Sequence, residues 1–234
     1  MHKNKTKGFT LAEILITISI IGVVAAMTIP SLINKIEMKQ YQSSLKKNYS
    51  NFSQAIYTLA SQNNLDLSSE TNFINSLESQ MSMGKKGTFA STTNLPANFN
   101  YKCYKSSSGM CGNLLKRPNI DASSSFITND GTRYLLYSFS SECNSSNYHV
   151  KINPTEITPQ NNACAVIYLD TNGDKNPNQI GVDLHMFFLV KKDNEYYLRP
   201  SGANVDTNCQ LDYPEDYNKS LHCTNRMLLD QTMP

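Results

Sequence analysis

Residues 8–30 read GFTLAEILITISIIGVVAAMTIP, and this stretch decides how the rest of the chain is arranged. From Phe9 to Ile29 it holds 21 residues with no lysine or arginine and with one acid, Glu13. At about 1.5 Å per residue, a helix of this length extends for about 30 Å, which is enough to cross the hydrocarbon core of a bilayer. The sequence therefore predicts a transmembrane helix over residues 9–29.

Positive charge is concentrated before this run. Lys3, Lys5 and Lys7 precede it, and the next cation is Lys35. Because cytoplasmic flanks carry an excess of basic residues, the charge bias predicts a single-pass chain with its N-terminus inside. Everything after residue 30 is then expected to be extracytoplasmic.

An alternative is a secretory signal peptide, with Val24-Ala25-Ala26 as a small-residue cleavage site. Three features argue against it: the apolar run is longer than a typical signal core, an acid lies inside it, and a helical pattern continues past it.

The segment Gly8-Phe9-Thr10-Leu11-Ala12-Glu13 resembles the processing site of type IV pilins and of the pseudopilins of type II secretion and competence systems. In that family a prepilin peptidase cuts on the cytoplasmic side after the glycine and methylates the new N-terminal amine, which here belongs to Phe9. Glu13 matches the acid at the fifth position of the mature chain. Gly22 and Pro30 also fall where such helices commonly carry these residues, and beyond Pro30 the resemblance is one of layout only.

The resemblance implies a structural role and no catalysis. It implies a cytoplasmic leader peptide over residues 1–8 and a filament subunit of a type IV pilus or a type II secretion-like system. Its implied partners are prepilin peptidase, other pilin or pseudopilin subunits, an inner-membrane assembly platform and the bacterial inner membrane itself. The head would be periplasmic or extracellular.

Glu13 is costly at membrane depth, by roughly 2.5 kcal/mol or more near the bilayer centre, unless it has a partner. Its own apolar helix offers no cation. The amine of Phe9 in a neighbouring subunit would neutralise it and set the axial offset between packed helices. The alternative is that Glu13, close to the mature end, snorkels to the interface.

Residues 30–62 continue with an amphipathic helical pattern. Pro30 removes a backbone donor, so we expect one helix over residues 9–62 that is interrupted or bent there. A dimeric coiled coil is the competing interpretation, but the spacing is irregular and no long heptad seam survives. The apolar positions that recur every three to five residues are Ile33, Ile36, Tyr41, Leu45, Tyr49, Phe52, Ile56 and Leu59.

Residues 63–234 form the predicted extracytoplasmic head. A short helix is predicted around Phe73 to Met81, capped by Ser68 or Ser69 and ended by Gly84, and the rest of residues 63–101 is interpreted as loop. Two hairpins are predicted, one turning at Asn129-Asp130-Gly131 and one near Lys192-Asp193-Asn194. The predicted strands are 126–128, 132–139, 164–169, 183–190 and 195–198, and the last 35 residues are interpreted as a disulfide-tied tail.

These elements predict an α+β fold in which a long N-terminal helix, half transmembrane and half amphipathic, packs on an antiparallel sheet of four or five strands, as in pilins.

All six cysteines lie beyond residue 100, which suggests disulfides in an oxidising compartment. A zinc site or free thiols is the rival interpretation, but no CxxC or zinc-type Cys/His spacing occurs. Local pairs, Cys103 with Cys111 and Cys209 with Cys223, are guesses among the possible connectivities. The other two cysteines are Cys143 and Cys164.

One loop, residues 170–183, carries oxygen-bearing side chains at alternate positions and is a candidate calcium site. The candidate ligands are Asp170, Asn172, Asp174, Asn176 and Asp183. The glycine of the loop does not stand where an EF-hand requires it, no terminal Glu follows, and Lys175 adds an unfavourable charge. The alternative is a loop of turn-forming residues that needs no metal and no other cofactor.

The charge balance does not indicate nucleic-acid binding. The net charge is +2, and removal of the first eight residues leaves 18 basic against 19 acidic residues, a net charge of −1. No HExxH, Gly-x-Ser-x-Gly or P-loop pattern occurs, so no enzyme is predicted. Besides the filament subunit, the alternatives are a minor tip subunit whose head binds DNA, a secreted substrate or a surface, and a membrane-anchored exoprotein.

Overall fold

The computed structural model describes residues 8–89, 102–103, 123–143, 163–173, 175, 177, 179–202 and 223–229. The chain divides into two compact units, Met1–Gln40 and Tyr41–Pro234. The division falls inside the first helix, α1, which runs from Leu11 to Ser61.

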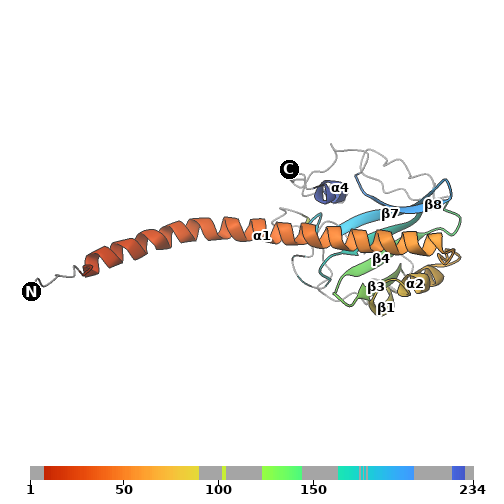
Figure 1. Cartoon of the computed structure of the whole chain (residues 1–234), viewed down its shortest axis with the longest axis horizontal. Coiled ribbons are helices and arrows are strands. Elements are labelled where there is room, and N and C mark those ends of the chain that lie inside the picture. Colours follow the sequence, from red (N-terminus) through yellow and green to blue (C-terminus); the bar gives the residue numbers. More distant parts are fainter. Residues whose placement is uncertain are drawn as a thin grey trace, which may run out of the picture. The chain divides into compact units, whose positions relative to one another are not determined.

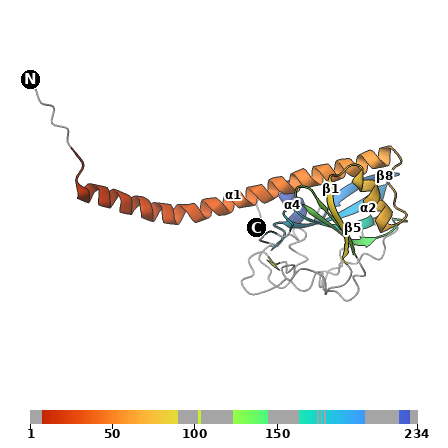
Figure 2. The same cartoon turned by 90° about the horizontal axis from the view of Figure 1, so that it is seen from below.

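Helix α1 is continuous through Pro30. Of the two predicted outcomes, an interruption or a bend, the interruption is therefore wrong, and Figure 2 shows α1 as one unbroken ribbon. Pro30 lacks the N–H that would bond the carbonyl of Ala26. The neighbouring hydroxyls of Thr28 and Ser31 donate to the carbonyls of Val24 at 2.9 Å and Thr28 at 3.0 Å. One lost hydrogen bond does not end a helix of 51 residues.

In the unit that begins at Tyr41, α1 buries one face against the sheet (Figure 1). Tyr49 stacks on Phe187 with ring centroids 5.5 Å apart, and Phe52 meets Tyr134 at 5.0 Å. The predicted apolar face is confirmed from Leu45 to Leu59, because these positions repeat every three to four residues on one side of the helix. Its buried residues are Leu45, Asn48, Phe52, Ala55, Ile56 and Leu59.

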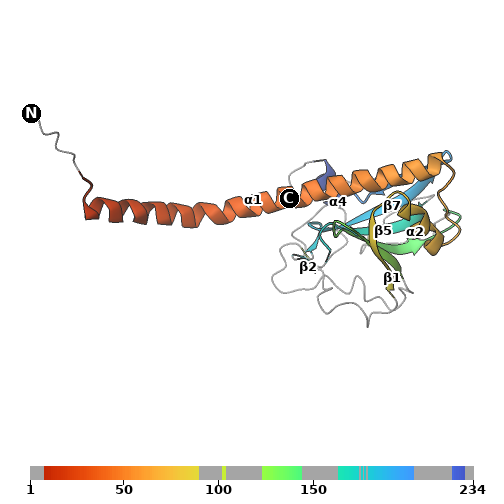
Figure 3. The same cartoon turned by 60° about the horizontal axis from the view of Figure 1, so that its bottom comes forward.

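The sheet consists of six antiparallel strands in the order β1-β3-β4-β5-β7-β8, with two short parallel additions, β6 beside β7 and β2 beside β6. Figures 1 and 3 show α1 and the short helix α2 against these strands. The strands are β1 (Met83–Phe89), β2 (Lys102–Cys103), β3 (Ser123–Thr128), β4 (Arg133–Phe139), β5 (Ala163–Asp170), β6 (Gln179–Ile180), β7 (Leu184–Lys192) and β8 (Glu195–Pro200).

Both predicted hairpins are confirmed. Strands β3 and β4 pair around Asn129-Asp130-Gly131, with Ile127 opposite Arg133. Strands β7 and β8 pair around Asp193 and Asn194, whose φ values of 50° and 67° are those of a tight two-residue turn. Every residue of β5 is buried, so this strand forms the centre of the core. The predicted α+β arrangement with an antiparallel sheet is therefore confirmed, but the sheet has six antiparallel strands and not the predicted four or five.

Helix α2 spans Glu70–Glu78, and its cap matches the sequence signal. The Ser69 side chain accepts a hydrogen bond from the Asn72 amide at 3.1 Å, as an N-cap residue does. The helix stops at Glu78, with Ser79 as its C-cap, so the prediction that Gly84 ends it is wrong. Gly84 instead lies in β1.

Four elements were not predicted: strand β1, the two-residue strands β2 and β6, and helix α4. Strand β1 was interpreted as loop, because its sequence MGKKGTF shows no alternation of apolar and polar residues. It is the terminal strand on its side of the sheet, where lysines are common. Helix α4 (Cys223–Leu228) consists of six residues that lie within the predicted tail and contact β7.

Candidate functional site: the N-terminal segment

The predicted cleavage point lies just before the first helix. Gly8, Phe9 and Thr10 are non-helical and exposed, and α1 begins at Leu11. The Phe9 side chain is 85% exposed, and nothing lies within 4 Å of a Cβ placed on Gly8. The Gly8–Phe9 bond is therefore accessible in a non-helical chain, as a peptidase requires of its substrate.

Glu13 forms a reciprocal cap with Thr10 at the start of α1. Its Oε2 accepts hydrogen bonds from the Thr10 amide at 2.8 Å and from the Thr10 hydroxyl at 2.9 Å. The Thr10 hydroxyl oxygen in turn accepts from the Glu13 amide at 3.3 Å. This is a capping box, in which two backbone donors of the first turn are satisfied by side chains.

This cap was not predicted, although Thr10-Leu11-Ala12-Glu13 carries the Thr-x-x-Glu signature before an apolar run. The cap uses only one oxygen of the carboxylate. Among the residues described, none donates to the other oxygen, Oε1. Glu13 can therefore cap its own helix and still accept a hydrogen bond from a second molecule.

The helix that follows is apolar on all sides. Between Leu11 and Ile36 its large hydrophobic side chains are exposed, from 45% for Ile14 to 76% for Met27. One window of 18 residues has a mean hydropathy of 2.2, so α1 is long and apolar enough to cross a membrane by length and composition. This extent of exposed apolar surface is unfavourable in water and favourable in lipid or against other helices.

The hydroxyl groups inside this apolar stretch do not need water. Each donates to a carbonyl of its own helix three or four residues earlier, at 2.8–3.0 Å. The hydroxyl residues are Thr17, Ser19, Thr28 and Ser31. Glu13 is the one charged side chain among residues 11–31, so it places a single carboxylate on this apolar surface.

Residues 3–29 match the family model described as the prokaryotic N-terminal methylation motif. The chain carries the type IV pilin and pseudopilin signature. No curated protein and no solved structure matches the chain significantly. The methylation motif therefore supports a pilin-like or pseudopilin subunit, and it implies assembly with other pilin subunits and processing by prepilin peptidase. Its family is structural and not catalytic.

The predicted calcium loop lies far along the chain from the methylation motif. Asp170 and Asp183 are fully buried, and the Thr171 amide donates to the Asp183 carbonyl at 2.8 Å, so the two ends of the loop meet. Oδ1 of Asp170 accepts from the amides of Asn172 at 3.2 Å and Gly173 at 2.8 Å, as in an Asx turn.

These hydrogen bonds give Asp170 a structural role at the start of the loop. Within the part of the chain that is described, no group of three His, Cys, Asp or Glu residues could hold a metal ion. Asp174 and Asn176 lie outside the described residues. The calcium site therefore stays a prediction.

Within the described residues, Cys143 is paired with Cys164 in a disulfide. This disulfide closes a separation of 21 residues and joins the turn after β4 to the start of β5. Cys223 is also disulfide-bonded. Cys111 and Cys209, one member each of the predicted pairs Cys103 with Cys111 and Cys209 with Cys223, lie outside the described residues, so both pairs stay predictions.

The histidine within β7, His185, is fully buried, and burial lowers its pKa to about 4. Its Nε2 lies 3.0 Å from the Val182 carbonyl oxygen. A neutral imidazole held by the turn just before its own strand is a core residue.

Proposed function

We propose that this protein is a structural filament subunit, held in the cytoplasmic membrane as a precursor and cut by prepilin peptidase after Gly8. Phe9 then becomes the methylated N-terminal residue. Lys3, Lys5 and Lys7 keep the leader in the cytoplasm, and the head follows on the other side of the membrane. The fibre belongs to a type IV pilus or to a type II secretion-like system.

The observation that carries this proposal is the combination of the methylation motif with an apolar helix surface interrupted by one carboxylate. In a bundle of such helices, the exposed apolar side chains of residues 11–36 pack against their counterparts in other subunits. Glu13 then lies next to the freed amine of a neighbouring Phe9. Oε1 accepts the ammonium group, while Oε2 continues to cap its own helix.

Glu13 thus has two roles, and substitution can separate them. Glu13→Ala removes both the cap and the acceptor. Thr10→Ala removes the hydroxyl of the cap and leaves the carboxylate, so a defect shared by both variants would indicate a loss of helix capping. Glu37→Ala removes an exposed acid of the same helix outside the apolar run and controls for net charge.

We expect Glu13→Ala to be cleaved after Gly8 but to enter sheared filaments at less than roughly a tenth of the wild-type level, because an unpaired ammonium is left in an apolar bundle. Thr10→Ala and Glu37→Ala should be incorporated normally. Quantitative immunoblots of the sheared fraction and of the membrane fraction measure this. Normal incorporation of Glu13→Ala, or an equal loss with Thr10→Ala, would contradict the assembly role.

A further inference from the structure

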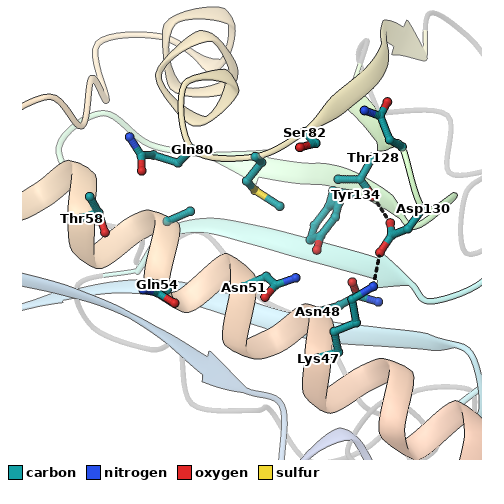
Figure 4. Close-up of a pocket in the computed structure, with 13 residues that line it drawn as sticks. Lys47, Asn48, Asn51, Gln54, Thr58, Gln80, Ser82, Thr128, Asp130 and Tyr134 are labelled. Carbon is teal, nitrogen blue, oxygen red and sulfur yellow. Dashed lines mark hydrogen bonds and ion pairs between the residues drawn. The ribbon is translucent and has the colours of Figure 1, made fainter.

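A polar cavity of about 500 Å³ lies in the unit Tyr41–Pro234, beside the second part of α1 (Figure 4). One wall is the face of α1 that carries Asn48, Asn51 and Gln54. The opposite wall comes from the segment after α2, with Gln80, and from the β3–β4 turn, with Asn129. None of these residues belongs to the methylation motif or to the calcium loop.

The cavity carries no net charge. Its charged lining residues are Lys47 and Asp130, whose Nζ and Oδ2 atoms lie 2.8 Å apart. Burial alone would raise the pKa of Asp130, but hydrogen bonds from Lys47 and Thr128 outweigh it and lower the pKa to about 2. The pair therefore stays ionised and compensated, and it offers no unbalanced charge to an ionic ligand.

Side-chain amides line the cavity from both sides. Each amide carries a carbonyl acceptor and two N–H donors. On α1 these amides, together with Lys47 and Thr58, recur every three or four residues along one face. From Lys47 to Thr58 this face is about 16 Å long at about 1.5 Å per residue. A ligand that lies along this face therefore meets both hydrogen-bond donors and hydrogen-bond acceptors.

Tyr134 supplies the observation that points to a ligand. Its ring is fixed between Phe126, stacked at 4.7 Å, and Phe52 at 5.0 Å. The side chain is 0% exposed, and no described residue forms a hydrogen bond with its hydroxyl. Figure 4 shows the hydroxyl pointing toward α1 in the region of Asn51. A buried hydroxyl without a partner is unfavourable, so a second molecule that pairs with it would stabilise the site.

Because this hydroxyl is buried, a ligand reaches it only after an exposed amide such as Asn51 changes rotamer. Exposed amides do this readily, and the change gives the ligand access to the phenol hydroxyl while the ring stays in place. The apolar side chains of the lining are Ala55, Met81 and the Tyr134 ring. The cavity therefore offers few apolar or ionic subsites for the side chains of a peptide ligand.

We propose that this cavity binds an uncharged oligosaccharide. Sugar hydroxyls are closely spaced hydrogen-bond donors and acceptors, and so are the side-chain amides that line the cavity. A sugar without charge also suits a cavity in which the charges of Lys47 and Asp130 compensate each other. The volume lies in the range of specific ligand pockets. This binding role is additional to filament assembly, and the residues involved are distinct from those that assemble.

The test uses the full-length chain in a polyoxyethylene detergent, because glycoside detergents would themselves present sugar. Maltotriose, cellotriose, chitotriose and galactotriose are titrated by calorimetry and by saturation-transfer NMR. Tetraalanine serves as the peptide probe and trigalacturonate as the anionic probe. We expect at least one neutral trisaccharide to bind and neither of the other two probes to do so.

Tyr134→Phe removes only the hydroxyl and should weaken saccharide binding roughly tenfold. Its melting temperature without sugar should not fall, because the hydroxyl has no partner to lose. Tyr49→Phe is the matched control, since the Tyr49 hydroxyl donates to the Leu198 carbonyl at 3.2 Å outside the cavity. That variant should melt at a lower temperature and bind sugar normally.

Three results would overturn the proposal: no neutral trisaccharide binds, the peptide or the anionic probe binds instead, or Tyr134→Phe binds as tightly as the wild type. None of these results bears on Glu13 or on filament assembly, so the two proposals succeed or fail separately.

Discussion

At the scale of single residues, Gly173 and Gly131 meet where the loop after β5 passes the β3–β4 turn. Gly173 has a φ of +66°, and a Cβ placed on it would lie 2.6 Å from the Gly131 carbonyl oxygen. Gly131 has a φ of +88°, with nothing within 4 Å of its Cβ position. Position 173 requires glycine both for its backbone conformation and for lack of space, whereas position 131 requires it for its backbone conformation alone.

We therefore expect Gly173→Ala to lower the free energy of unfolding by about 1–3 kcal/mol, since strain and a backbone clash add. Gly131→Ala should cost about 1 kcal/mol, from the left-handed backbone alone. Urea unfolding of the full-length chain in detergent measures both. Equal effects of the two substitutions would contradict the close approach.

The residue scale also separates what the sequence predicts from what it does not. The exposure of Gly8 and Phe9 before the helix agrees with the predicted processing site, because the motif is local. The Thr10–Glu13 cap was equally local and readable as Thr-x-x-Glu, but Glu13 was assessed only as a charge in a membrane. The cavity around Tyr134 was not predictable, because it joins α1 to a hairpin about 80 residues later, and no local pattern specifies that contact.

At the scale of elements, α1 changes its surroundings along its length. Before residue 40 its apolar side chains are exposed, and from Leu45 to Leu59 every third or fourth residue is buried. Periodicity predicted the second part well, because one face meets a sheet and the other meets water.

Two substitutions on this helix test the assignment of its faces. Phe52 is 1% exposed and contacts Tyr134, whereas Tyr57 on the same helix is 70% exposed. Phe52→Ala should lower the free energy of unfolding by about 3–5 kcal/mol, through lost burial and a cavity. Tyr57→Ala should stay within about 0.5 kcal/mol of wild type. Thermal and urea unfolding compare the two, and a large loss with Tyr57→Ala would place that side chain in a core.

The strands also divide into those that the sequence predicts and those that it does not. Strands β3, β4, β5, β7 and β8 were predicted because β-branched and aromatic residues cluster there between clear turns. Strand β1 was missed, since its lysines and glycines stand at a sheet edge where burial imposes no alternation. Helix α4 was missed because six residues are too few for a helical period to show.

At the scale of the whole molecule, the methylation motif covers residues 3–29 and supports the class of protein. The α+β fold is defined by the sheet that α1 covers, and all strands of this sheet lie outside the motif. The identity of the fibre and the copy number of the subunit depend on other proteins, so neither folding physics nor this chain specifies them. If the cavity binds sugar, a minor subunit that presents its head at the fibre tip becomes the preferred form of the proposal.

The measurement that tests the central claim most directly is the intact mass of the protein recovered from cells with and without prepilin peptidase. With the peptidase, the account predicts one species that begins at Phe9 and carries one methyl group on its amine. Without it, the chain should keep residues 1–8 and stay in the membrane. A chain that keeps its first eight residues in the presence of the peptidase, or one that begins near residue 27, would contradict the account.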